Sequence, residues 1–327
     1  MEQAADEFII FLDNLFKLYP TFVGRDFYLT GESYSGKYIP AFSKRILEEN
    51  EKLQQTRYNL KASLIGDPYV APVAQKISMY KVPESLNVLD ESNMGQIATM
   101  HRRCEEMVHT DIDIAYATCS DIMDEYISKV SGGVFPYDNR IFGYDWDPKE
   151  DLVISYLTNE TSAQELYENI HVQDSTKDPV FEMSSKRVSE AFNGDKIIDY
   201  THVYQELIDL GFPLMVYAGE FDAQDGPATQ NVWLKRLNFK SPLLGMENEK
   251  QIYYIRDHDI DGKQQVGGYW QESGNFTFLT VPKAGHFVPA NYYIASYQFF
   301  TDYLENQRLV CHGAGGELTP GQECSTT

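Results

Sequence analysis

The 327-residue sequence is short of cysteine, of basic residues and of long apolar runs. It has four cysteines and no C-x-x-C pair, which argues against a zinc ribbon or a thiol redox motif. Its 27 basic residues stand against 49 acidic ones, so nucleic acid and anionic membrane surfaces are unfavourable partners. No apolar run approaches the length of a membrane span, so no transmembrane segment is predicted. The hydrophobic content of 43% is enough for a full core.

The four cysteines form two local couples, one in the middle of the chain and one near its end. Four cysteines allow three connectivities, and the sequence alone does not choose among them. Short separation favours Cys104–Cys119 and Cys311–Cys324. These two pairs are our disulfide candidates.

Two Asn-x-Thr sequons make Asn159 and Asn275 glycosylation candidates. Together with paired cysteines they favour a protein of the secretory route. The net charge of −22 fits residence in an acidic lumen, although it fits ordinary solubility as well. The first 20 residues have no basic region and no small-residue cleavage site, so we interpret them as an amphipathic helix and not as a signal peptide.

Hydrophobic patterning predicts an α/β protein. Short buried strands alternate with helices, which is typical of a mostly parallel sheet; the strands are expected at 26–30, 60–65, 212–219, 251–255 and 276–281. Between 73 and 201 the sequence is charged, helical and interrupted, and strand signals are few. We predict a core made of residues 1–72 and 202–327, with residues 73–201 inserted as a helical cap over the strand ends.

The segment 26–40, DFYLTGESYSGKYIP, predicts a strand, a sharp turn and a helix. A serine at such a turn is the nucleophile elbow of α/β-hydrolases, usually written G-x-S-x-G. Ser33 is the candidate nucleophile, and Ser35 stands where the generic pattern has glycine. Pro40 is expected to begin a fresh helical turn. An ordinary Ser/Gly turn before a helix is the alternative.

A serine nucleophile needs a general base and an acid to orient that base. In α/β-hydrolases these follow along the chain in the order Ser, Asp, His. Ser33 ends one expected strand, Asp222 follows another and His286 follows a third, so a parallel sheet would bring all three to one edge. Asp225 competes with Asp222, which we prefer because it is nearer the strand end. Our hypothesis is a Ser33–His286–Asp222 triad with no metal and no cofactor.

Several segments resemble the serine carboxypeptidase family. GESYSGKYIP is similar to its nucleophile signature, VYAGEFD to its acid segment and KAGHFVP to its histidine segment. PYDNR resembles an element of the family's cap, and GGYWQESGNFTFLTV resembles the hairpin before the histidine. The similarity extends from about residue 1 to about residue 305. It implies an α/β-hydrolase fold with a helical cap insertion.

The resemblance implies an enzyme that releases single amino acids from peptide C-termini, best at acidic pH. Ser33 would be the nucleophile, His286 the base and Asp222 its partner, while the backbone N–H of Tyr34 would donate to the oxyanion. Glu32 would help to bind the terminal carboxylate of the substrate, which requires a protonated carboxyl. The implied partners are peptide or protein C-termini, the implied locations are a lysosome or vacuole or the outside of the cell, and family members are often homodimers.

Three departures from the family pattern affect these expectations. LIGDPYVAP carries Asp67 and Pro68 where the family usually has Gly-Asn-Gly, and Tyr293 replaces a common proline. We expect neither substitution to touch the triad. The family's Asn-Gly-Gly-Pro-Gly loop, which supplies a second oxyanion donor, has no match in residues 1–32, so the chain is expected to lack the family's first strands.

Two other functions are compatible with the sequence. One is an acyltransferase on the same scaffold, which takes an acyl group from an ester and gives it to an alcohol. The other is an inactive hydrolase-like chain that acts as a binding or protective partner. The preserved Ser–Asp–His order favours an enzyme, and the unmatched oxyanion loop favours the inactive alternative.

Overall fold

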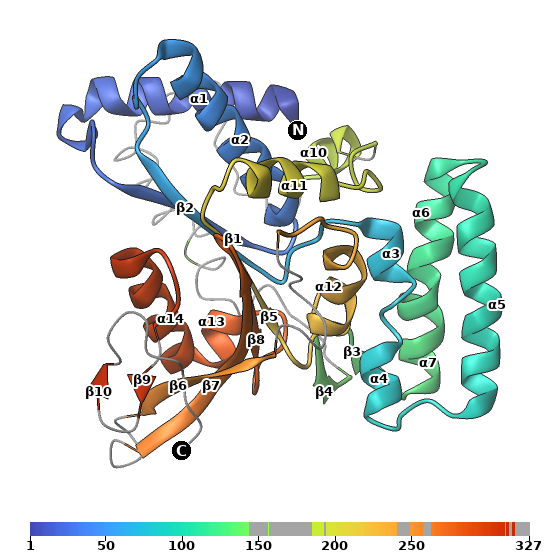
Figure 1. Cartoon of the computed structure of the whole chain (residues 1–327). Coiled ribbons are helices and arrows are strands. Elements are labelled where there is room, and N and C mark those ends of the chain that lie inside the picture. Colours follow the sequence, from blue (N-terminus) through green and yellow to red (C-terminus); the bar gives the residue numbers. More distant parts are fainter. Residues whose placement is uncertain are drawn as a thin grey trace.

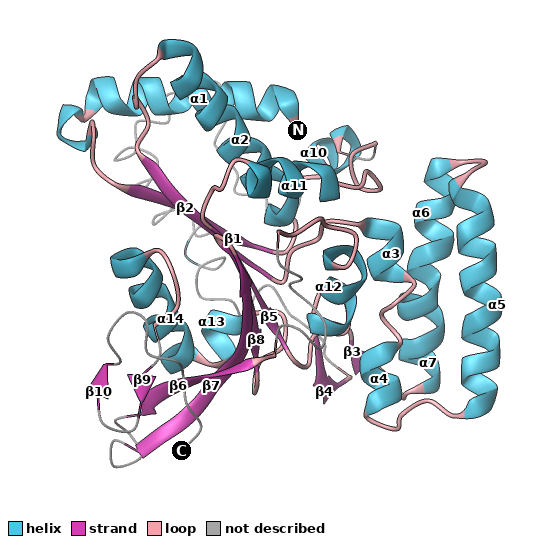
Figure 2. Ribbon diagram, in the orientation of Figure 1, coloured by secondary structure: helices cyan, strands magenta, loops and turns pink. Residues whose placement is uncertain are grey.

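The computed structural model describes residues 1–143, 156, 185–192, 194–240, 249–257, 263–310, 312–313 and 316–317. Its main feature is a twisted six-stranded sheet of order β1-β2-β5-β8-β7-β6, drawn in magenta in Figure 2. The strands are β1 (Phe27–Glu32), β2 (Leu60–Gly66), β5 (Leu214–Gly219), β6 (Gln251–Asp257), β7 (Lys263–Ser273) and β8 (Phe276–Val281). The first four in sheet order run parallel, and β7 pairs antiparallel with both of its neighbours, β8 and β6. The expected mostly parallel sheet is confirmed.

Helices cover both faces of this sheet (Figure 1). One face packs against α1 (Glu2–Leu18), α2 (Ser35–Leu53), α11 (Thr201–Asp209) and α12 (Pro227–Leu234). The other packs against α13 (Val288–Asn291) and α14 (Tyr293–Asn306). Strand β5 is buried along its whole length and divides its side chains between the faces: Val216 points to the first core and Tyr217 to the second. The sheet edge that carries the strand ends is therefore held rigidly between two cores.

The expectation that Pro40 begins a fresh helical turn is wrong. Helix α2 runs unbroken from Ser35 to Leu53 with Pro40 inside it. A proline there has no N–H for the carbonyl four residues earlier, which is that of Gly36. The hydroxyl of Tyr204, on α11, donates to this carbonyl at 2.9 Å. The neighbouring helix thus satisfies the carbonyl that Pro40 cannot.

The segment between β2 and β5 is mainly helical within the residues that the structure describes. It contains α3 (Pro72–Lys76), α4 (Lys81–Ser85), α5 (Glu91–Val108), α6 (Ile112–Asp121), a π-helix (Ile122–Ile127), α7 (Ser128–Val130) and α10 (Lys186–Ala191). A small hairpin joins β3 (Val134–Phe135) to β4 (Asp138–Phe142). Helices α5 and α6 lie side by side on one flank (Figure 1) and enclose a third core. The division at residues 73 and 201 stays a prediction.

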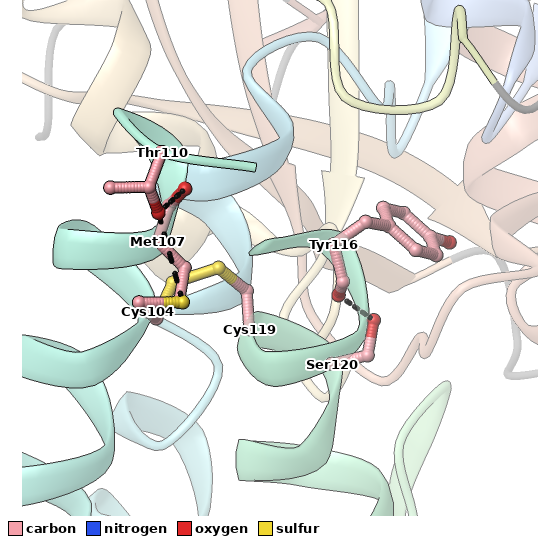
Figure 3. Close-up of a disulfide and its surroundings, with 6 residues drawn as sticks. All are labelled: Cys104, Met107, Thr110, Tyr116, Cys119 and Ser120. Atoms are coloured by element: carbon pink, nitrogen blue, oxygen red, sulfur yellow. Dashed lines mark hydrogen bonds between the residues drawn. A yellow bond between two sulfur atoms is a disulfide. The ribbon is translucent and has the colours of Figure 1, made fainter. Parts of the chain in front are cut away.

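A disulfide joins α5 to α6, as Figure 3 shows. It links Cys104 to Cys119, the pair that short separation favours, and both side chains are buried. Closing a loop of this length restricts the unfolded chain and stabilises the fold by about 3 kcal/mol. Cys311, Cys324 and the sequon at Asn159 lie outside the described residues.

The remaining elements are short. A 3-10 turn (Pro20–Phe22) follows α1, and β9 (His312–Gly313) pairs with β10 (Gly316–Glu317). The helix expected over 287–304 is two helices, α13 and α14, because the backbone at Tyr292 leaves the helical region. Asn275 is exposed in the turn between β7 and β8. Across the described residues, no helix is both long and apolar enough to cross a membrane.

Candidate active site

Ser33 occupies a strained turn between β1 and α2. Its φ of 61° lies in the left-handed region, which residues other than glycine rarely adopt. Its N–H donates to the carbonyl of Gly66 at 2.9 Å, and its carbonyl accepts from the N–H groups of Gly36 and Tyr69, both at 2.9 Å. The turn is therefore fixed both by α2 and by the segment that follows β2, as a nucleophile elbow requires.

Two glycines allow this turn to pack closely. A Cβ on Gly31 would lie 2.7 Å from the Cβ of Ser35, and one on Gly36 would lie 2.6 Å from the Cβ of Pro68. Both distances are too short for carbon atoms. Ser35 itself is buried, so this departure from the generic G-x-S-x-G pattern fits beside Gly31 without opening the turn.

His286 and Asp222 form a buried pair. Asp222 follows β5 and His286 follows β8, and their exposed fractions are 0% and 2%. The Nδ1 atom of His286 lies 2.6 Å from Oδ2 of Asp222. The other carboxylate oxygen of Asp222 accepts from the backbone N–H of Gln224 at 2.8 Å. This arrangement orients the imidazole so that its Nε2 is left to act on a substrate or nucleophile.

The charge around His286 favours its protonated form. Burial by itself lowers the pKa of the imidazole, but the carboxylates of Asp222, Asp225 and Glu32 outweigh it and raise the pKa above its ordinary value. Asp225, the competitor of Asp222, is bound instead by the side-chain amides of Gln75 and Gln224, at 2.9 and 3.0 Å. His286 is therefore hydrogen-bonded to Asp222 and not to Asp225.

A close approach of backbones brings the Asp222 and His286 loops together. A Cβ on Gly219, the last residue of β5, would lie 2.0 Å from the carbonyl oxygen of Gly285. The β3–β4 hairpin then covers His286: the carbonyl of Tyr137 accepts from the N–H of His286 at 2.7 Å, and the two rings are 4.7 Å apart. The family resemblance places PYDNR in the cap, and nothing in the sequence indicates this contact with the histidine.

Glu32, the last residue of β1, belongs to the same electrostatic cluster. Partial burial is the main reason that its pKa rises to about 7; nearby His286 lowers it and Asp222 raises it. Since β1, β2, β5 and β8 are neighbours and parallel, the residues that follow them lie at one edge of the sheet. Glu32 and Ser33 therefore share this edge with Asp222 and His286.

Asp67 contradicts the expectation that the family departures stay clear of the triad. It is fully buried at the end of β2, and its carboxylate oxygen lies within 4.8 Å of donor atoms of both Asp222 and His286. Among the described residues this trio has the spacing of a possible metal site. Because Asp222 is already bonded to His286, we interpret the trio as a cluster of acidic groups around the Asp222–His286 hydrogen bond. Its position after a buried strand was the sequence signal that could have identified it.

A second cluster supports Tyr34, the residue after Ser33. Lys37 is buried with its Nζ 5.3 Å from the centre of the Tyr34 ring and 3.7 Å from Oδ2 of Asp195. The hydroxyls of Tyr34 and Tyr200 donate to the two oxygens of Asp195, at 2.7 and 2.9 Å. Burial lowers the pKa of Lys37 to about 8, although Asp195 opposes this. These contacts hold the beginning of α2, where the N–H of Tyr34 lies at the positive end of the helix.

A mostly parallel sheet with a strained serine after one strand, and a bonded Asp–His pair after two others, defines the class of α/β-hydrolases. A model of the serine carboxypeptidase family matches residues 1–306. The chain belongs to this family, as the sequence resemblance predicted.

Individual relatives are distant. The chain is 27% identical to serine carboxypeptidase-like 47 of Arabidopsis thaliana over 307 residues, which are 91% of this chain and 57% of that protein. It is 28% identical to the pheromone-processing carboxypeptidase KEX1 of Arthroderma otae, over 88% of this chain and 46% of that protein. The chain therefore spans about half the length of the curated relatives it matches.

A solved structure agrees on the fold. The crystal structure of Kex1(delta)p, a prohormone-processing carboxypeptidase from Saccharomyces cerevisiae, matches 97% of this chain with a TM-score of 0.79 at 22% identity. The match covers 69% of that chain. The predicted α/β-hydrolase fold is thereby confirmed.

Proposed function

We propose that this chain carries the catalytic residues of a serine carboxypeptidase that releases amino acids from peptide C-termini. Membership of the serine carboxypeptidase family supports this proposal. Ser33, His286 and Asp222 are the proposed triad, with peptide or protein C-termini as substrates. The chain spans about half the length of the curated relatives it matches, so this activity is a proposal.

The proposed chemistry follows from the site. Ser33 attacks the last peptide carbonyl and passes its proton to Nε2 of His286, and the N–H of Tyr34 donates to the developing oxyanion. His286 then gives the proton to the leaving amino acid, and water releases the acyl group in a second step of the same kind. Asp222 holds the imidazole and stabilises it while it is charged. The triad accounts for acyl transfer in general but not for a preference for C-termini.

The observation that carries the carboxypeptidase proposal is Glu32. It is a half-buried carboxyl next to Ser33, and its pKa of about 7 keeps it largely protonated in acidic solution. A protonated carboxyl can donate a hydrogen bond to a substrate carboxylate, whereas an ionised one repels it. Glu32 is therefore the proposed binding group for the terminal carboxylate.

The affinity for peptides with a free C-terminal carboxylate is expected to weaken as the pH rises. Between pH 6 and pH 8 the protonated fraction of Glu32 falls about tenfold for a pKa of about 7, so KM should rise about tenfold. Glu32→Gln keeps a donor but cannot ionise, so its KM should stay level over this range. Steady-state hydrolysis of one peptide by both proteins measures the effect.

The same peptide with an amidated C-terminus is the matched control, because it has no carboxylate to repel. Its KM should not change with pH in either protein. If KM depends on pH equally for the two peptides, Glu32 does not bind the terminal carboxylate of the substrate. Transfer of an acyl group from an ester to an alcohol, without peptide hydrolysis, would favour the acyltransferase function instead.

Location and assembly complete the proposal. The buried disulfide and the exposed sequon at Asn275 support a glycoprotein of the secretory route that is delivered to a lysosome or vacuole or secreted. A substrate-binding carboxyl that works when protonated fits an acidic compartment. A homodimer remains a prediction from the family resemblance.

A further inference from the structure

Asp67 is a buried acid for which the proposed mechanism has no use. Its side chain is completely buried, and its φ of 40° lies in the left-handed region, which asparagine and aspartate tolerate better than other residues. Its N–H donates to the carbonyl of Tyr217 at 2.8 Å, and Oδ1 accepts from the N–H of Gly219 at 2.9 Å. One half of the carboxyl group is thus fixed by β5.

The other half has no donor. Oδ2 of Asp67 is inaccessible and has no hydrogen-bond partner. A buried carboxylate oxygen without a donor is costly, and an ionised carboxylate in this position would be more so. A protonated Oδ2 is itself a donor, which removes the difficulty if an acceptor lies nearby. The Asp222 carboxylate has an oxygen within 4.8 Å of a carboxylate oxygen of Asp67, and each Asp222 oxygen can take a second hydrogen bond; a hydrogen bond between the two carboxyl groups requires their oxygens to approach to about 2.7 Å.

The charges that face Asp67 agree with a neutral carboxyl. Among the described residues no ion pair to Asp67 is found, and the nearby His286 is paired with Asp222. Burial first, and then the neighbouring carboxylates, raise its pKa well above its usual range. The titratable groups around it are Asp222, Glu32, Asp225, His286 and Tyr217.

We propose that Asp67 is a positioning residue that remains a neutral acid in the folded protein: its carboxyl O–H donates to the Asp222 carboxylate and steadies that carboxylate for its bond to His286. Asp222 would then be held from three sides, by His286, by the N–H of Gln224 and by Asp67. This inference rests on the proposed function in one respect only, namely that the Asp222–His286 pair serves Ser33.

The first test does not require activity. Unfolded Asp67 loses its proton near pH 4, while the folded form keeps it, so above that pH the folded state binds more protons than the unfolded state. The stability of the wild type should therefore fall with rising pH relative to Asp67→Asn, which cannot ionise. The difference in Tm, variant minus wild type, should grow by about 2 °C or more between pH 4 and pH 7. A constant or shrinking difference would mean that Asp67 is ionised in the fold.

The second test concerns positioning. The rate of labelling by a fluorophosphonate probe reports on Ser33 and His286 and does not depend on Glu32 binding a carboxylate. Asp67→Asn keeps both a donor and an acceptor, so its labelling rate should stay within about threefold of the wild type, with the same pH midpoint. Asp67→Ala removes the donor, and a less well-placed base should lower the rate by about ten- to a hundredfold.

Asp302→Asn is the matched control, because it makes the same substitution at a buried aspartate outside the site. Asp302 lies on α14, where it accepts from the hydroxyl of Tyr253 at 2.6 Å, so the substitution should lower Tm without changing the labelling profile.

Equal labelling of Asp67→Ala and Asp67→Asn would overturn the positioning role. A midpoint lowered by a full pH unit in Asp67→Asn would show that Asp67 is anionic, because removing a nearby negative charge lowers the pKa of His286. If the wild type is not labelled, the proposed function fails, while the Tm comparison still decides the state of Asp67.

Discussion

Replacing Asp222 with asparagine is expected to lower turnover by about 10⁴-fold while leaving the fold intact. Asp222 accepts from Nδ1 of His286 at 2.6 Å and from the N–H of Gln224 at 2.8 Å. An asparagine can preserve the contact with Gln224 through its carbonyl oxygen. It then presents an amide N–H₂ to Nδ1, which stabilises the wrong imidazole tautomer and no longer stabilises the charged ring. Peptide hydrolysis and fluorophosphonate labelling both measure this loss.

Glu220→Gln is the matched control for this substitution. Glu220 precedes Asp222 by two residues and is exposed, so the change removes a negative charge from the same loop without touching His286. Its activity should stay near that of the wild type. If Asp222→Asn keeps most of its activity at an unchanged Tm, Asp222 is not the partner of the catalytic base and Asp225 has to be tested in its place.

Adding a methyl group at Gly219 is expected to reduce activity about a hundredfold and to destabilise the fold. A Cβ there would lie 2.0 Å from the carbonyl oxygen of Gly285 and 2.8 Å from that of Ala284. Neither backbone can move without moving the Asp–His pair, because His286 directly follows Gly285 and Asp222 lies three residues after Gly219. A misplacement of about 1 Å in a catalytic pair costs on the order of 10² in rate. The measurement is turnover together with the free energy of unfolding of Gly219→Ala.

Gly95→Ala provides the comparison. Gly95 lies within α5, and a Cβ there meets no atom within 4 Å. Alanine in a helix is favoured over glycine by about 1 kcal/mol, so this variant should be as active as the wild type and at least as stable. Normal turnover by Gly219→Ala would mean that the contact with Gly285 does not set the geometry of the site.

The sheet could be predicted because its strands carry strong local signals. The segments around Leu64, Val216 and Phe278 are short buried runs that end at turn residues, and each became a parallel strand. Their order along the chain then placed Ser33, Asp222 and His286 at one edge. What local patterning could not show was tertiary compensation. Helix α2 continues through Pro40 because a hydroxyl from another helix binds the carbonyl that the proline leaves free.

The site was predicted in its motifs but not in its surroundings. A motif names a residue type at a fixed offset, and it does not say which buried groups from other strands face that residue. Asp67 was taken as a harmless departure because its local sequence places it after a buried strand but does not show that Asp222 and His286, which follow other strands, lie close to it. The contact of Tyr137 with His286 was missed for the same reason, since the two residues are far apart in the sequence and meet only through the β3–β4 hairpin.

The most direct measurement is labelling of the folded protein by a fluorophosphonate, followed by identification of the modified residue by mass spectrometry. The proposed function predicts one adduct on Ser33, at a rate that falls on acidification because the raised pKa of His286 leaves less neutral imidazole to accept the serine proton. Ser33→Ala should fold with a similar Tm and take up no label. An unlabelled Ser33 in a folded wild-type protein, or equal labelling of Ser33→Ala, would contradict the proposal.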